Sequence, residues 1–235
     1  MASGKSSHRR HLKTTESVPV PQFMARLLRP LVVLLALTAT AASAAGPETG
    51  VVRLRAFLAN VQVVEARFRQ QVIDSRQQVL EDASGSVVMQ RPGRFRWNYE
   101  KPFERVIVAD GERVWLYEAD LDQVTIRRLT AGIGDTPAAL LTGKESVLER
   151  FTVEKSWMEE GLALVRLVPR SAEADFAGVT LGFDGAELRR LVLDDRLGQQ
   201  TRIDLTEVRT NPRVSPEAFR FQTPAGADVI DDSEL

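Results

Sequence analysis

The chain has 235 residues, with 31 basic and 32 acidic side chains, no cysteine and two histidines, His8 and His11. Beyond His11 the sequence therefore excludes Ser-His-Asp and Cys-His catalysis, and any metal site with His or Cys ligands. We predict no enzyme, no cofactor and no metal site, and the net charge of −1 gives no general attraction to nucleic acid.

Residues 1–44 have the pattern of a secretory leader. Arg26 and Arg29 precede a run of small and apolar residues over 31–44, which ends in the triplet Ala-Ser-Ala. That ending fits the small-x-small rule for signal peptidase. We therefore predict export, with 45–235 as a single mature domain. An uncleaved anchor helix is the alternative, although the run is short for a membrane span.

The start of translation is open between Met1 and Met24, because Met24 and the basic residues after it would begin an ordinary signal. Removing 1–44 takes away six basic and one acidic side chain and leaves a net charge of −6. No cysteine is available after the signal to carry a lipid anchor. The mature protein is thus expected to be free in solution, in the periplasm if the cell is Gram-negative.

The first elements of the mature chain are predicted from a change in the spacing of apolar residues, from helical to alternating. Val51–Glu65 has the apolar spacing of a helix that covers one side of a sheet. From Ala66 the pattern alternates, which suits an edge-like strand. Asp82–Gly85 has turn composition, so we predict a hairpin there between strand-like flanks.

The most regular pattern lies at Arg94–Glu100. Phe95, Trp97 and Tyr99 fall on one face of a predicted strand, and polar residues fall on the other. Asp110-Gly111 then separates two further strand-like runs and predicts a tight hairpin. The result is an antiparallel meander with an aromatic row on one face.

The strands are interrupted between Gly132 and Gly143. Thr136 can cap a short helix that starts at Pro137, and a second short helix is predicted at Ser146–Arg150. Short helices are not stable alone, so these must dock on the sheet. A plain helical loop over a sheet edge is the simplest interpretation.

The second half of the chain is predicted to be mainly strands. The strand-like runs are 151–157, 162–169, 178–183, 187–194, 200–209 and a last one at 219–221, after a one-turn helix that starts at Ser215. Such spacing favours one antiparallel barrel or sandwich. The pairs at 194–195 and 231–232 are adjacent aspartates, which point to opposite faces of a strand and are expected to be solvated.

The run MQRPGRFRWNYEKPFERVIVADGERVWLY resembles the outer-membrane lipoprotein carrier protein family, above all at Arg91–Trp97 and Asp110–Trp115. The resemblance extends from about Val51 to Val229 in the same element order. It implies a mainly β fold with a few helices, namely an incomplete antiparallel β-barrel (half-barrel) with an N-terminal helix and a short-helix lid. The implied function is a periplasmic chaperone that binds the acyl chains of lipoproteins and carries them between membranes.

The resemblance also implies site residues. The family arginine at the motif position helps to hold a cavity closed, and this role falls on Arg91, for which a solvated arginine at a strand end is the alternative. The residues expected to line an acyl-chain cavity are Phe68, Phe95, Trp97, Tyr99, Val106, Val108, Leu116, Leu140 and Leu141. Plain core packing would explain the same side chains. The strand phase after Tyr99 is open, because neighbours such as Ile107 are also apolar.

The implied partners are acylated lipoproteins, an inner-membrane ATP-driven lipoprotein release complex and an outer-membrane receptor lipoprotein. No nucleic acid is expected, and the protein is expected to be a monomer. The main alternative is a periplasmic lipid- or peptide-sensing regulatory domain on the same fold. A hydrolase that acts through carboxylates alone is a third hypothesis, which the missing His and Cys oppose.

Overall fold

The structure is a computed structural model that describes residues 49–129, 141–143 and 145–233. The predicted leader, the predicted helix start at Thr136 and the cavity residue Leu140 lie outside the described residues. Residues Ser43–Leu235 form one compact unit, and the description below concerns this unit alone. Within the described ranges, no helix combines the length and the hydropathy that a membrane crossing requires.

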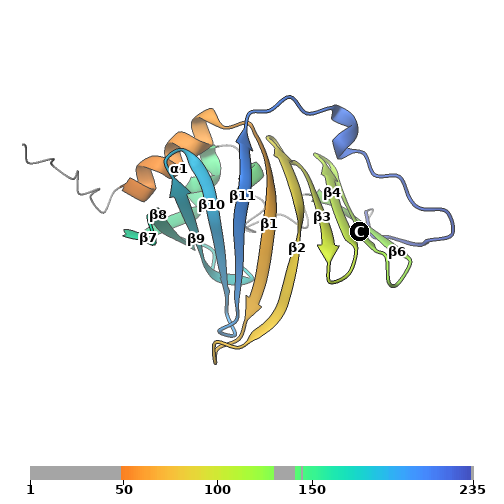
Figure 1. The fold of residues 1–235 in the computed structure, drawn as a ribbon, viewed down its shortest axis with the longest axis horizontal. Helices are drawn as coiled ribbons and strands as arrows, with labels where there is room; N and C mark the ends of the chain where they lie inside the picture. Colours follow the sequence, from red (N-terminus) through yellow and green to blue (C-terminus); the bar gives the residue numbers. More distant parts are fainter. Residues whose placement is uncertain (1–48, 130–140, 144, 234–235) are drawn as a thin grey trace, which may run out of the picture. The chain divides into compact units, whose positions relative to one another are not determined.

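One sheet of twelve strands organises the described residues (Figure 1). The strand order is β12-β6-β5-β4-β3-β2-β1-β11-β10-β9-β8-β7, and β12 pairs with β6 in parallel while the other ladders are antiparallel. The strands are β1 (Val63–Ile73), β2 (Val79–Gln90), β3 (Arg94–Lys101), β4 (Arg105–Asp110), β5 (Arg113–Glu118), β6 (Gln123–Arg128), β7 (Phe151–Glu159), β8 (Leu162–Pro169), β9 (Phe176–Asp184), β10 (Glu187–Asp195), β11 (Gln200–Thr210) and β12 (Asp228–Asp231). The open sheet confirms the predicted fold class.

Helix α1 (Thr49–Asn60) is shorter than the predicted Val51–Glu65. The chain turns after Asn60 because the Asn211 side chain holds the junction. Its Oδ1 accepts hydrogen bonds from the backbone N–H groups of Gln62 and Val63 at 2.8 and 3.1 Å, and its Nδ2 donates to the Asn60 carbonyl at 3.0 Å. The β-branched residues that follow then favour a strand.

The first hairpin is also displaced from its predicted position. The turn lies between β1 and β2, where Asp74 Oδ1 accepts hydrogen bonds from the backbone N–H groups of Arg76 and Gln78, both at 2.8 Å. The predicted turn at Asp82–Gly85 was wrong, because these residues lie inside β2. Strand β1 was predicted to be edge-like, but it pairs with both β2 and β11.

Gly85 is required in β2 by packing rather than by a turn. A Cβ atom at this position would lie 1.8 Å from the Asn98 carbonyl oxygen and 3.0 Å from the Phe68 ring. Glycine therefore lets β3 approach β2 closely while the Phe68 ring covers the gap. The glycine in the turn-like run 82–85 is thus explained by close packing between strands and not by a turn.

Several other elements agree with the sequence. The β4–β5 hairpin turns at Asp110-Gly111, where Asp110 Oδ1 accepts hydrogen bonds from the N–H groups of Glu112 and Arg113 at 2.7 and 2.9 Å. The short 3-10 helix η1 (Glu145–Arg150) occupies the second predicted helix. The helix η2 (Pro216–Phe219) is capped by Ser215 as predicted, but the expected last strand at 219–221 is replaced by β12.

We call the side of the sheet that packs against α1 the inner face. Helix α1 contacts β7, β8 and β9, and the Phe57 ring lies 5.7 Å from the ring of Phe183. Val165, Leu167, Val179 and Leu181 are fully buried beneath it. The main core of the unit therefore lies on this face.

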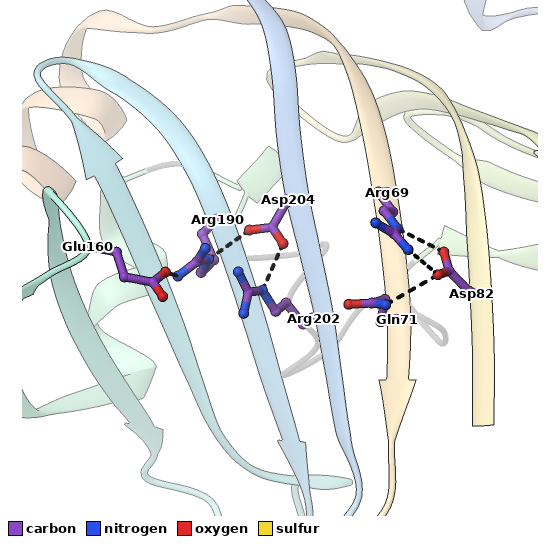
Figure 2. A network of polar contacts seen from close by, with 7 residues as sticks. All are labelled: Arg69, Gln71, Asp82, Glu160, Arg190, Arg202 and Asp204. Atoms are coloured by element: carbon purple, nitrogen blue, oxygen red, sulfur yellow. Dashed lines mark hydrogen bonds and ion pairs between the residues drawn. The ribbon is translucent and has the colours of Figure 1, made fainter. Parts of the chain in front are cut away.

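The opposite, outer face carries ion pairs over β1, β2, β10 and β11 (Figure 2). Arg190 donates hydrogen bonds to Asp204 and to Glu160, each at 2.7 Å, and Arg202 donates to Asp204 at 2.7 Å. On the same face Arg69 donates to Asp82. This part of the outer face is thus polar and partly exposed to solvent.

The aspartate pair Asp194-Asp195 differs from its predicted solvated state. Asp194 forms an ion pair with Arg166 on the outer face, and its side chain is 22% exposed. Asp195 Oδ1 accepts hydrogen bonds from the N–H groups of Leu197 and Gln199 and so closes the β10–β11 turn. Both side chains therefore have structural partners.

Candidate functional site

The predicted aromatic row lies on the inner face. Directly opposite residues of an antiparallel ladder point to the same side. Trp97 faces Val87 of β2 and Ile107 of β4, and Phe68 of β1 packs edge-on against it, with ring centres 4.9 Å apart. Phe68 makes a similar contact with Tyr99 at 5.0 Å. Two strands, β1 and β3, thus supply one continuous aromatic cluster.

This cluster is covered in the structure. The exposed fractions of Phe68, Phe95 and Tyr99 are 3%, 6% and 9%, and Leu141 is 6% exposed. All four belong to the main buried core, and Trp97 is half-buried against it. The aromatic cluster is therefore largely covered, while Trp97 keeps partial exposure.

The strand register divides the remaining predicted cavity residues between the two faces. Leu116 faces Ile107 across the β4–β5 ladder, so it lies on the inner face with Trp97. Val106 and Val108 alternate with Ile107 and lie on the outer face. They cannot line the same cavity as the aromatic row, and we leave them out of the proposed site.

The outer face of β4–β6 forms a second apolar layer, beneath the segment that follows β11. Val108 faces Trp115 and is fully buried. The Phe221 ring stacks on Trp115 with centres 6.5 Å apart and packs on Tyr117 at 6.3 Å. Figure 1 shows this segment crossing from β11 towards the β6 edge. Both faces of these strands are covered, so their sequences do not alternate.

Arg91 lies between β2 and β3 and joins three parts of the chain. Its Nη1 donates hydrogen bonds to the carbonyls of Phe57, Leu58 and Val61 at 3.1, 3.1 and 2.6 Å. Its Nε donates to the Leu141 carbonyl at 2.9 Å. Carbonyls in the last turn of a helix have no partner within the helix and favour a cation. Arg91 thus ties α1 and the segment at Leu141 to the sheet.

The Arg91 guanidinium is largely withdrawn from solvent and has backbone carbonyls as its partners. Burial lowers the pKa of Arg91 to about 10. Its Nη2 atom is buried and has no hydrogen-bond partner in the part of the chain that the structure describes. Burying a guanidinium costs free energy unless its remaining hydrogen bonds to the backbone carbonyls are kept. The position is therefore unlike the solvated arginine of the alternative interpretation.

One polar residue of the inner face was not singled out from the sequence. Gln70 accepts a hydrogen bond from the Tyr99 hydroxyl at 3.0 Å, and both residues are 9% exposed. The alternation Phe68, Gln70, Val72 contained this signal, because it places a glutamine at a buried phase. Over the described residues, no group of three or more carboxylates is arranged to hold a metal ion.

The comparisons with known proteins agree with one another. Residues 59–222 match the family model described as "Outer membrane lipoprotein carrier protein LolA". A protein of Methylobacillus flagellatus is 40% identical over 77% of this chain and 88% of its own length. One of Methylococcus capsulatus is 41% identical over 77% and 86%, and one of Nitrosospira multiformis is 42% identical over 77% and 88%. All three are described as outer-membrane lipoprotein carrier proteins.

Proposed function

Because the chain belongs to the outer membrane lipoprotein carrier protein family, we propose that it binds the acyl chains of lipoproteins on its inner face and carries them through the periplasm. The observation that carries this proposal is the aromatic cluster of the inner face, closed by the hydrogen bonds of Arg91. The names of the relatives favour a carrier over the sensing domain that the sequence left open.

The energetic problem of such a carrier is to bind acyl chains firmly and still release them. Each methylene group removed from water contributes about 0.8 kcal/mol. Phe68, Phe95, Trp97, Tyr99 and Leu116 offer a matching apolar surface. When the site is empty, the same side chains must be covered by the protein itself. The buried state of the cluster is what an unloaded carrier requires.

Loading then requires α1 and the segment at Leu141 to separate from the sheet. The hydrogen bonds of Arg91 join these parts, so they favour the closed, empty state. A cargo that fills the inner face compensates for their loss, and their return favours release. Arg91 thereby acts on the balance between the two states and need not touch the cargo.

The partners follow from the family resemblance. The donor in this proposal is an inner-membrane ATP-driven lipoprotein release complex, and the acceptor is an outer-membrane receptor lipoprotein. The carrier works between them as a monomer. Transfer of an acylated lipoprotein between these partners makes and breaks no covalent bond, as expected for a carrier.

The test is capture of a lipoprotein from membranes. The purified protein is incubated with inner-membrane vesicles that hold a labelled lipoprotein and the release complex, and the soluble fraction is sized. We expect a one-to-one soluble complex that is lost in Trp97→Glu, on the inner face. The matched control Trp157→Glu changes a tryptophan of the outer face and should retain capture. No capture by the folded wild-type chain would overturn the proposal.

A further inference from the structure

The buried pair of Gln70 and Tyr99 interrupts an otherwise apolar cluster. Burying an amide and a hydroxyl costs free energy that their mutual hydrogen bond offsets only in part. A leucine and a phenylalanine would fill the same space without that cost. Phe68, which contacts Tyr99, shows that apolar side chains pack well here. Packing alone therefore does not explain why these two positions hold polar side chains.

The pair keeps unused hydrogen-bonding capacity. A carboxamide has two N–H donors, and a hydroxyl both donates and accepts. In the bond between them, the Tyr99 hydroxyl donates its proton and the Gln70 amide oxygen accepts it. Among the described residues, the bond from Tyr99 is the one hydrogen bond that the Gln70 side chain makes. The inner face thus presents amide donors at a point surrounded by apolar side chains.

A pocket of about 390 Å³ lies beside this pair. Tyr99 forms part of its wall, together with Ala83, which faces Gln70 across the β1–β2 ladder. The β3–β4 end of the pocket is lined by Arg105 and by the exposed Phe103. The rest of the lining is Leu80, Glu81, Asp82, Lys101 and Pro102. The pocket therefore connects the aromatic cluster with the end of the sheet where β3 meets β4.

The pocket has a cationic side. The Arg105 guanidinium lies over the Tyr99 ring, 5.1 Å from its centre, and is 4.0 Å from the Glu81 carboxylate. Burial is the main cause that raises the pKa of Tyr99, although the nearby Arg105 opposes it. The hydroxyl stays protonated at neutral pH, so it can orient the Gln70 amide continuously.

Resting on the proposed carrier function, we propose that Gln70, Tyr99 and Arg105 form a polar subsite for the ester carbonyl groups of a diacylglycerol unit. In such a unit the carbonyl oxygens stand where the acyl chains meet the glycerol, and they accept hydrogen bonds without donating any. The amide of Gln70 and the guanidinium of Arg105 supply donors. The chains continue along Trp97 and Phe95.

The subsite also fixes the direction of the cargo. Arg91 precedes β3, and Tyr99 lies near its other end. The glycerol end of the lipid is therefore placed at the pocket beside Phe103, far from the hydrogen bonds of Arg91. The protein part of the cargo leaves the carrier there, and the chain ends point towards Leu141.

The experiment compares two probes that differ only in these carbonyls. One is a short peptide whose terminal cysteine carries a diacylglyceryl group with ester bonds, and the other carries the dialkyl ether analogue. Binding is measured by displacement of a fluorescent fatty acid. A diacyl phosphatidylglycerol probe shows whether phospholipid esters use the same subsite as the lipopeptide.

The variants remove the polar groups in pairs. Gln70→Leu with Tyr99→Phe removes both partners at once, which keeps the fold close to its original stability. Gln71→Leu with Tyr117→Phe is the matched control, because both residues lie on the outer face. Urea unfolding of both double variants checks that each is folded.

We expect the wild type and the control to bind the ester probe roughly three- to tenfold more tightly than the ether probe, the effect of one ordinary hydrogen bond. The inner double variant should bind the two probes alike. A preference that survives in that variant, or equal binding by the wild type, would overturn the subsite and leave the carrier function intact. Failure of the wild type to bind either probe would overturn both.

Discussion

Arg91 shows how one side chain can control a large surface. Its planar group has five N–H donors in fixed directions, so it reaches carbonyls of α1 and of Leu141 together. A lysine has the same charge but a single point of attachment. The pattern of four bonds to backbone carbonyls therefore depends on the shape of arginine as well as on its charge.

Arg91→Leu should leave the fold intact and weaken the closed state. We expect transfer of a bound lipoprotein to an acceptor membrane to fall by at least about tenfold, because the loss of even one of the four hydrogen bonds from this charged donor is worth that much. Far-UV circular dichroism and a transfer assay measure the two properties. Arg94→Leu is the control, because that side chain is exposed on the neighbouring strand. Transfer at the wild-type rate by Arg91→Leu would count against the closing role.

At the scale of elements, the junction between α1 and β1 depends on a residue far along the chain. Asn211 follows β11, and its positive φ of 53° is a conformation that asparagine tolerates better than most residues. The same residue accepts two hydrogen bonds from the junction and donates one to it. The end of the helix is thus decided by a tertiary contact.

Asn211→Asp and Asn211→Ala separate these contributions. The aspartate keeps the acceptor oxygens and loses the N–H donor to Asn60, so we expect a loss of unfolding free energy of about 1 kcal/mol. The alanine loses all three bonds and also fits the positive φ poorly, and it should cost roughly 2–4 kcal/mol. Urea unfolding measures both. Equal stability of the two variants would show that the side-chain acceptor is unimportant.

The sequence predicts the elements that local chemistry determines. The β4–β5 hairpin follows from Asp110-Gly111. The aromatic row on one face of β3 follows from period 2. The inward or outward phase of β4 and β5 was left open. Position in the sheet is a non-local property. The central place of β1 depends on pairing with β11, which lies more than a hundred residues further along. No local pattern reports that pairing.

Of the candidate site, the part on β3 was predictable from local pattern and the part on β4 and β5 was not. Phe95, Trp97 and Tyr99 have polar neighbours on the outer face, so their phase was clear. Strands β4 and β5 are apolar on both sides because the segment around Phe221 covers the outer one. For that reason the pattern could not distinguish Val106 and Val108 from the inward-facing Ile107.

At the scale of the whole molecule, exposed ion pairs on the outer face make stability depend on pH. The bond from Arg69 lowers the pKa of Asp82, and those from Arg67 and Arg190 lower the pKa of Glu100 and of Glu160. Each carboxylate thus has a lower pKa in the folded state than in the unfolded chain. Their stabilisation is complete above the unfolded values of 3.8 to 4.5 and is lost as the pH falls through the folded values.

We therefore expect the urea midpoint to be nearly constant from pH 7 to about 5 and to fall below about pH 4.5. Salt at about 1 M should reduce this fall, because exposed pairs are screened. Unfolding curves at a series of pH values, with and without salt, provide the measurement. A midpoint that does not change down to pH 3 would show that these ion pairs do not stabilise the fold.

The parallel pairing of β12 with β6 has a consequence for how copies of this protein meet one another. An open sheet leaves unpaired N–H and C=O groups along its last strand, which can template the addition of a second chain. Strand β12 occupies that position on β6, is only four residues long and begins and ends with an aspartate. A short, acidic last strand makes a poor template. The carboxyl-terminal segment thus makes this edge of the sheet a poor place for another copy of the carrier to add a strand.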